Sequence, residues 1–190
     1  MKSSNHWKSH FPLVAFPLVA LFCLLAAASA GAQTASELSQ RSRNALSQLC
    51  ANNPAARHLR RSAVAILVFP DIIKAGFMFG AQHGEGALLS RGQAIAYYRT
   101  TAASYGLQAG VQKFGYAMFF MNQGDLNYLR SSNGWEFGTG PSIVIVDEGM
   151  ARSFSTTTMH KGVYVFTFDE RGLMAGLGLQ GSKITPFHPR

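Results

Sequence analysis

The sequence is poor in cysteine, in acidic residues and in charged residues of any kind. Two cysteines in 190 residues exclude a small fold stapled by several disulfides. Charged residues make up 14% of the chain and hydrophobic residues 47%, which excludes intrinsic disorder, because a disordered chain needs low hydrophobicity and high charge density. A length of 190 residues also excludes a large multidomain protein, since roughly 100–200 residues form one domain.

The first 32 residues resemble a secretory signal peptide rather than part of a fold. Lys2 and Lys8 form a positive start without an acidic residue, and an apolar run over residues 11–28 follows. The run ends in small residues that fit the A-x-A cleavage rule, at 28–30 or at 30–32. The alternative is an uncleaved membrane anchor, which is disfavoured because the apolar stretch is short and no basic stop-transfer cluster follows. We therefore expect residues 1–32 to be removed and residues 33–190 to form the exported domain.

Removal of this leader changes the charge and the cysteine content of the chain. The nine acidic residues all remain, 15 basic residues remain, and the net charge falls from +8 to +6. Cys50 becomes the only cysteine, which excludes an intramolecular disulfide. We expect its thiol to be buried as a small apolar group.

Two helices are predicted before residue 62. One covers residues 36–50 and ends at Asn52-Asn53-Pro54, and a short one follows over residues 54–61. On the first helix, one face carries Leu38, Ala45, Leu46 and Leu49. The whole segment has five arginines against Glu37 alone, so it holds two thirds of the excess positive charge. These arginines are Arg41, Arg43, Arg57, Arg60 and Arg61.

From residue 63 onward the composition favours β-structure. Strands are predicted over 63–69, 94–101, 114–121, 142–146 and 163–168. Pro70-Asp71 is expected to end the first strand. Residues 169–172 are expected to form a hairpin turn into a partner strand over 173–180. One further helix is predicted over 125–130, with Asp125 as its N-cap.

Three glycine-rich strings share the order Gly, apolar residue, Gln. They cover residues 80–84, 106–110 and 178–181. Glycine inside strands marks bulges, bends or a close approach of two backbones. The sequence therefore predicts an α+β fold in which an N-terminal basic helical segment packs on a curved, mostly antiparallel β-sheet or partial barrel.

The sequence contains no recognisable catalytic or metal-binding constellation. Gly84-Glu85-Gly86 lacks the third glycine of a dinucleotide fingerprint, there is no Walker sequence, and the histidines are scattered singly. We therefore expect no metal, no cofactor and no enzymatic activity, with a hydrolase centred on His83 or Asp147 as a remote alternative. Basic residues are not interleaved with aromatic ones, so we expect no nucleic-acid partner.

The basic segment is interpreted as a cationic amphipathic element. Its arginines are expected to lie along an anionic lipid surface, each contributing about 1 kcal/mol, while Leu38, Leu46 and Leu49 insert between headgroups. The alternative carries equal weight: the leucines pack on the β core, because the segment has no Trp or Phe to anchor it in a membrane.

The strings that follow resemble one known family. Residues 63–70 read AVAILVFP, residues 74–80 read KAGFMFG, and residues 84–86 read GEG. Together with SYGLQAG at 104–110 and GLMAGLGLQG at 172–181, they resemble the SYLF-domain family, closest to its exported bacterial branch. The similarity covers about residues 36–185. The family often has a Trp-Ser pair after the first glycine block, where this chain has Ala96-Tyr97-Tyr98-Arg99.

This resemblance implies a lipid-binding domain without enzymatic activity. Relatives in eukaryotes, the yeast actin-patch proteins among them, bind phosphoinositides through a basic N-terminal segment, and some bind actin. In this chain that segment corresponds to the five arginines, with Lys74 in the first glycine-rich stretch. The expected partner is an anionic phospholipid surface in the periplasm or at the periphery of the outer membrane. An envelope protein–protein module that uses the exposed sheet is the alternative.

Overall fold

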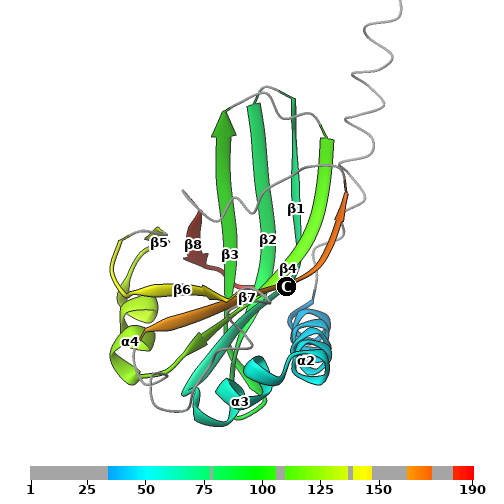
Figure 1. Cartoon of the computed structure of the whole chain (residues 1–190). Helices are drawn as coiled ribbons and strands as arrows, with labels where there is room; N and C mark the ends of the chain where they lie inside the picture. The colour runs from blue at the N-terminus through cyan, green and yellow to red at the C-terminus, as the bar shows by residue number, and fades with distance from the viewer. Residues whose placement is uncertain (1–33, 78, 106–109, 137–138, 147–161, 173–181) are drawn as a thin grey trace, which may run out of the picture. The chain divides into compact units, whose positions relative to one another are not determined.

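The structure is a computed structural model that describes residues 34–77, 79–105, 110–136, 139–146, 162–172 and 182–190 (Figure 1). Residues 33–190 belong to one compact unit. Its helices are α2 (Ala35–Asn52), α3 (Pro54–Ser62) and α4 (Gln123–Ser131). Its strands are β1 (Ala65–Phe77), β2 (Phe79–Ser90), β3 (Gln93–Tyr105), β4 (Gly110–Phe120), β5 (Trp135–Glu136), β6 (Ile143–Val146), β7 (Val163–Gly172) and β8 (Lys183–Pro186). None of the described helices is long and apolar enough to cross a membrane.

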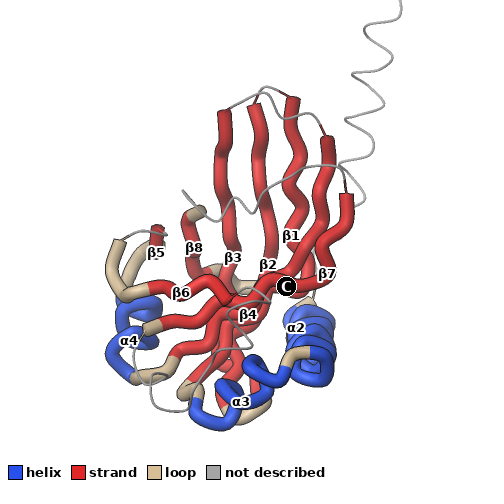
Figure 2. The backbone as a smooth tube through the Cα atoms, viewed as in Figure 1, coloured by secondary structure: helices blue, strands red, loops and turns tan. Residues whose placement is uncertain are grey.

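The strands belong to one sheet in the order β5-β8-β3-β2-β1-β4-β7-β6. Every pairing is antiparallel except that of β6 with β7, which is parallel. The long central strands bend along their length (Figure 2). The predicted α+β class, with helices before a curved and mostly antiparallel sheet, is confirmed.

The sheet buries apolar side chains on both faces. Ile66 and Val68 of β1 pack with α2 and α3 on one face, and Leu67 and Phe69 pack with α4 on the other. Side chains alternate between the two faces along β7, since Tyr164 and Phe166 join the first core and Val163 and Val165 join the second. We call the first of these the helix face.

Side chains cap the N-termini of both α2 and α3. Thr34 and Glu37 form a reciprocal capping box, and the hydrogen bonds from Thr34 hold the pKa of Glu37 below its usual value. At the other end, Asn53 leaves the helix and caps α3 by accepting from the backbone N–H of Ala56 at 3.1 Å. The predicted break at residues 52–54 is confirmed, and α2 extends two residues beyond the predicted end.

The leucines of α2 lie in the core. Leu38, Leu46 and Leu49 are each 7% exposed or less, and all three side chains are covered by the protein itself. This corrects the expectation that they insert between lipid headgroups, because a side chain already packed on the sheet gains no apolar burial from a membrane. Cys50 is also buried, as predicted.

Three predicted boundaries are wrong, and the physical reasons differ. Strand β1 continues past Pro70-Asp71 because a bulge between Phe69 and Ile72 absorbs the proline. Strand β7 likewise continues through residues 169–172, which were predicted as a turn. Helix α4 is capped by Asn122, whose side chain accepts from the N–H of Asp125 at 2.9 Å, so the predicted cap, Asp125, lies inside the first turn.

The first glycine-rich string lies in the first half of β2, a strand that was not predicted. Another glycine of this strand, Gly86, is needed for close packing: a Cβ on it would lie 2.4 Å from the carbonyl oxygen of Val68 and 2.7 Å from Cδ1 of Phe69. The side chain of Phe69 therefore crosses the neighbouring strand where that strand has no side chain. The predicted partner strand over 173–180 lies outside the described residues.

Candidate functional site

The five arginines of the N-terminal segment differ in their surroundings. Arg41 forms an ion pair with Asp71, whose other oxygen, Oδ1, lies 2.6 Å from Nζ of Lys113. Arg57 donates to the carbonyl oxygens of Cys50 at 2.9 Å and Ala51 at 2.8 Å, and so caps the end of α2. The charge of Arg41 is therefore compensated, and Arg57 serves the helix end.

Arg43 is half-buried on α2. Its Nη2 donates to Oε1 of Gln40 one turn earlier, at 2.9 Å. Arg41 and Arg43 were predicted to act together on a lipid surface, and neither is fully exposed.

Lys74 does not lie on the surface where it was expected to bind lipid. It is 5% exposed, and its neighbours in register are the buried Gln82 on β2 and Gln112 on β4. Its side chain shares the sheet face of Ile72, because residues two apart on a strand point the same way. No hydrogen bond or ion pair joins it to another of the described residues. A buried lysine is unavailable to a headgroup, which corrects this member of the predicted site.

Arg60 and Arg61 meet a third arginine that the N-terminal segment does not contain. They occupy the last turn of α3, where positive charge is favoured by the helix dipole. Arg91 comes from the tight turn between β2 and β3, in which Arg91 and Gly92 both have positive φ, 51° and 81°. The three side chains line one cavity of about 1,050 Å³, here called the basic hollow.

The basic hollow combines cationic walls with an apolar floor. Among the described residues that line it, none is acidic. Its apolar lining includes Leu46, Val64, Ile66 and Leu89, and Ile95 on its border is 49% exposed. Arg60 also lies beside Cys50: burial raises the pKa of this thiol, and the nearby guanidinium partly opposes the shift.

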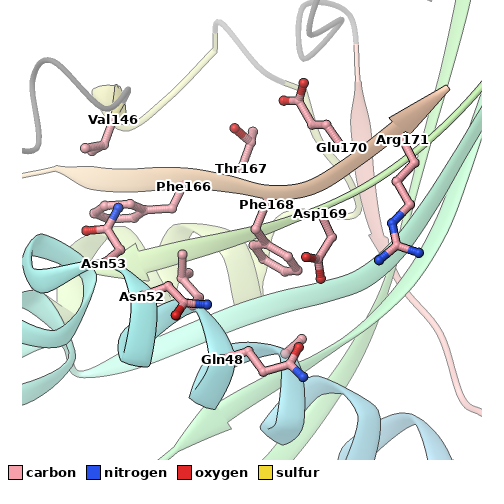
Figure 3. A pocket seen from close by; sticks show the side chains of 12 residues that line it. Gln48, Asn52, Asn53, Val146, Phe166, Thr167, Phe168, Asp169, Glu170 and Arg171 are labelled. Atoms are coloured by element: carbon pink, nitrogen blue, oxygen red, sulfur yellow. The ribbon is translucent and has the colours of Figure 1, made fainter. Parts of the chain in front are cut away.

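A second cavity of about 880 Å³ lies between α2 and β7, and it differs from the first in chemistry (Figure 3). We call it the polar groove. Amide side chains of Gln48, Asn52 and Asn53 border it, Phe166 and Phe168 supply aromatic rings, and charged residues of β7 complete it. Sequence reasoning missed this groove because its two walls are more than a hundred residues apart.

Of the two residues named in the remote hydrolase alternative, the structure describes His83 only. His83 is exposed on β2, with Nε2 3.9 Å from Oε1 of Glu85, which also accepts from Arg99 at 3.0 Å. Asp147 lies outside the described residues. Among the residues that are described, no group of three or more His, Cys, Asp or Glu is placed to hold a metal ion. The hydrolase alternative stays a prediction.

Sequence reasoning identified Arg60 and Arg61 and missed Arg91. A signal was present, since Arg91-Gly92 stands between two runs of β-forming residues and reads as a tight turn. The position of that turn beside α3, however, depends on the whole sheet. No protein-family model matches the chain, and no curated protein matches it significantly.

Proposed function

We propose that the protein binds anionic phospholipid surfaces through the basic hollow. The observation that carries this proposal is the convergence of Arg60, Arg61 and Arg91 around one cavity, whose lining includes no acidic residue in the part of the chain that the structure describes. Guanidinium groups bind phosphate oxygens in pairs of parallel hydrogen bonds, and they are more weakly hydrated than ammonium groups. The resemblance to SYLF-domain proteins supports the same class of ligand.

The mechanism is mainly electrostatic. Each basic residue near an anionic membrane surface contributes about 1 kcal/mol, so the three arginines of the hollow contribute about 3 kcal/mol. The leucines of α2 add nothing, because they are buried in the core. The exposed side chain of Ile95 supplies apolar contact at the border of the hollow. Association of this kind is weakened by salt.

Co-sedimentation with vesicles tests the proposal. The purified protein should bind phosphatidylglycerol vesicles and dissociate from them as the salt concentration is raised. It should not bind phosphatidylcholine vesicles. Arg91→Ala should weaken binding about fivefold, the equivalent of about 1 kcal/mol. Arg130→Ala on α4 removes the same charge from a residue outside the hollow and serves as the control. Equal binding to both vesicle types rejects the proposal.

We propose that the protein acts after export, in the periplasm or at the periphery of the outer membrane. This location rests on the leader-like residues 1–32 and on the resemblance to the exported branch of the family. Anionic phospholipid headgroups are present on membranes bordering that compartment, which makes the location consistent with the proposed ligand.

A protein–protein module is the second candidate, and one observation favours it. Ile73, Phe79 and Val111 lie on the helix face beyond α2 and are 54%, 70% and 60% exposed. Apolar side chains gathered on one exposed face mark contact sites for other molecules. Self-association measured by light scattering, and its loss in Val111→Thr, would support this candidate. If the protein stays monomeric at every concentration measured, self-association through this face is rejected.

A further inference from the structure

The polar groove has a wall on β7 that a regular strand does not provide. Phe168 pairs with Gly115 of β4 and Arg171 pairs with Lys113, so two residues of β7 stand opposite the single residue between these partners. This is a β-bulge, and Asp169 within it has a φ of 54°. Consecutive side chains of a regular strand alternate between faces, but Phe168 and Asp169 both extend toward α2 (Figure 3).

Gly115 holds the ring of Phe168 at this wall. A Cβ on Gly115 would lie 2.2 Å from Cε2 of Phe168, so the ring rests against β4 at a place where β4 has no side chain. The ring is half-buried and borders the groove. Bulges are frequent beside binding sites, where they re-aim a side chain, and this bulge adds a carboxylate next to an aromatic ring.

The facing wall consists of amide groups. Gln48 and Asn52 are four residues apart on α2 and share one side of the helix. In the described part of the chain, no hydrogen bond occupies either of these side chains. The side-chain oxygen of Asn53, Oδ1, caps α3 by accepting a hydrogen bond, and this leaves the side-chain NH2 group of Asn53 as a donor. The wall therefore offers both donors and acceptors to a ligand.

The charges that face the groove cancel. Asp169, Glu170 and Arg171 of β7 all border the groove. The side chains of Asp169 and Arg171 extend toward the side of α2, whereas that of Glu170 extends to the opposite side of the strand (Figure 3). A groove with one inward carboxylate and one inward guanidinium attracts neither anions nor cations strongly. Its ligand should instead be neutral, able to donate and accept hydrogen bonds, and apolar on one face.

We propose that the polar groove binds a neutral saccharide. Amide, carboxylate and guanidinium groups pair with adjacent hydroxyls, which both donate and accept, and the ring of Phe168 packs against the C–H face of a sugar ring. The volume of about 880 Å³ lies within the range of about 300–1,000 Å³ that is common for small-ligand sites. The site is independent of the basic hollow, since the two cavities share no lining residue.

Saturation-transfer NMR and calorimetry with two neutral trisaccharides, maltotriose and tri-N-acetylglucosamine, test this proposal. At least one should bind saturably, with transfer to ring protons, while the neutral peptide trialanine should not. Asn52→Ala should lower the affinity about threefold to tenfold, the loss expected from one neutral hydrogen bond. Asn44→Ala is the matched control, because Asn44 is an exposed asparagine of the same helix that pairs with Gln40 and does not line the groove.

Three results would overturn the proposal. They are the absence of saturable binding to both trisaccharides, saturable binding that Asn52→Ala leaves unchanged, and stronger binding of trialanine than of either saccharide. The last result would assign the groove to an extended peptide instead. Circular dichroism of each variant confirms that a lost signal reflects the groove and not unfolding. Arg91→Ala should bind the saccharide as the wild type does, which separates this test from that of the lipid proposal.

Discussion

The basic hollow and the polar groove are similar in volume, border the same helix, and differ in chemistry. Leu46 of α2 lines the hollow, whereas Ala45 and Leu49 line the groove. In the two proposals, three arginines with no acidic residue among the described lining favour anions at the hollow, and the opposite charges in the groove favour a neutral ligand. One amphipathic helix packed on a sheet therefore separates two sites, each completed by residues from a different hairpin or strand.

The net charge of a segment, counted from its sequence, differs from the charge that the folded protein leaves accessible to a ligand. Residues 36–61 carry four net positive charges, yet Arg41 is paired with Asp71 and Arg57 holds the end of α2. Three arginines of the segment keep an uncompensated charge: Arg43, which contacts the neutral Gln40, and Arg60 and Arg61, which line the hollow together with Arg91 from the sheet. The fold thus concentrates positive potential at a place that a count along the chain does not reveal.

The largest expected effect concerns the packing of α3, which carries two of the three arginines. Leu59 is fully buried, so Leu59→Ala should lower the free energy of unfolding by about 2–5 kcal/mol and disorganise the hollow before the groove. Urea denaturation measures this change. Ile145→Ala, at a side chain that is 46% exposed, should cost much less. Equal losses in the two variants would show that α3 is not anchored through Leu59.

A substitution on β4 should affect the groove and spare the hollow. Gly115→Ala places a Cβ against the ring of Phe168 and should cost about 1–3 kcal/mol through overpacking. Saccharide affinity should fall with it, whereas binding to anionic vesicles should be unchanged. If vesicle binding falls in parallel, the two sites are coupled and the comparison between them fails.

Lys74 allows a test of the difference between buried and accessible charge. Lys74→Met replaces a buried amino group, which lies beside Gln82 and Gln112, with an apolar side chain. This variant should raise the free energy of unfolding by about 1–3 kcal/mol. Vesicle binding should not change, because this side chain is not at the surface. A destabilised variant would mean that the ammonium is satisfied in the fold, and weaker vesicle binding would return Lys74 to the lipid site.

The smallest effect is expected at the turn that presents Arg91. Gly92 has a φ of 81° with open space around it, so Gly92→Ala should cost about 1 kcal/mol from backbone conformation alone. Because the substitution should alter the turn and displace Arg91, the affinity for anionic vesicles should fall modestly, whereas saccharide binding should not change. Unchanged vesicle affinity would indicate that the hollow tolerates movement of Arg91.

The sequence predicts local elements well and misjudges the places where the sheet overrides local signals. The leucine stripe of α2 and the alternation in β7 follow from periodicity alone. Pro70-Asp71 and residues 169–172 have the composition of strand ends, yet each lies in a bulge that neighbouring strands hold in register. Strand β2 escaped prediction because its glycines lower β propensity while serving close packing.

The candidate sites could be predicted only in part because they combine distant segments. Periodicity shows that Leu38, Leu46 and Leu49 share a face, but it does not show whether that face meets lipid or the sheet. Lys74 is internal because it shares the face of Ile72, which becomes apparent only once β1 is known to continue past the bulge. Arg91 and Asp169 join their sites through strand pairing, for which no short sequence motif exists.

The most direct test of the central claim compares two charge-reversed variants on phosphatidylglycerol vesicles. Arg60→Glu/Arg61→Glu changes four charge units at the hollow, and Arg130→Glu/Arg190→Glu changes four at exposed residues outside it. At about 1 kcal/mol per unit, the first variant should lose binding by roughly a thousandfold and the second should lose far less. Equal losses in the two variants would contradict the account, since binding would then follow the total charge of the protein and not the basic hollow.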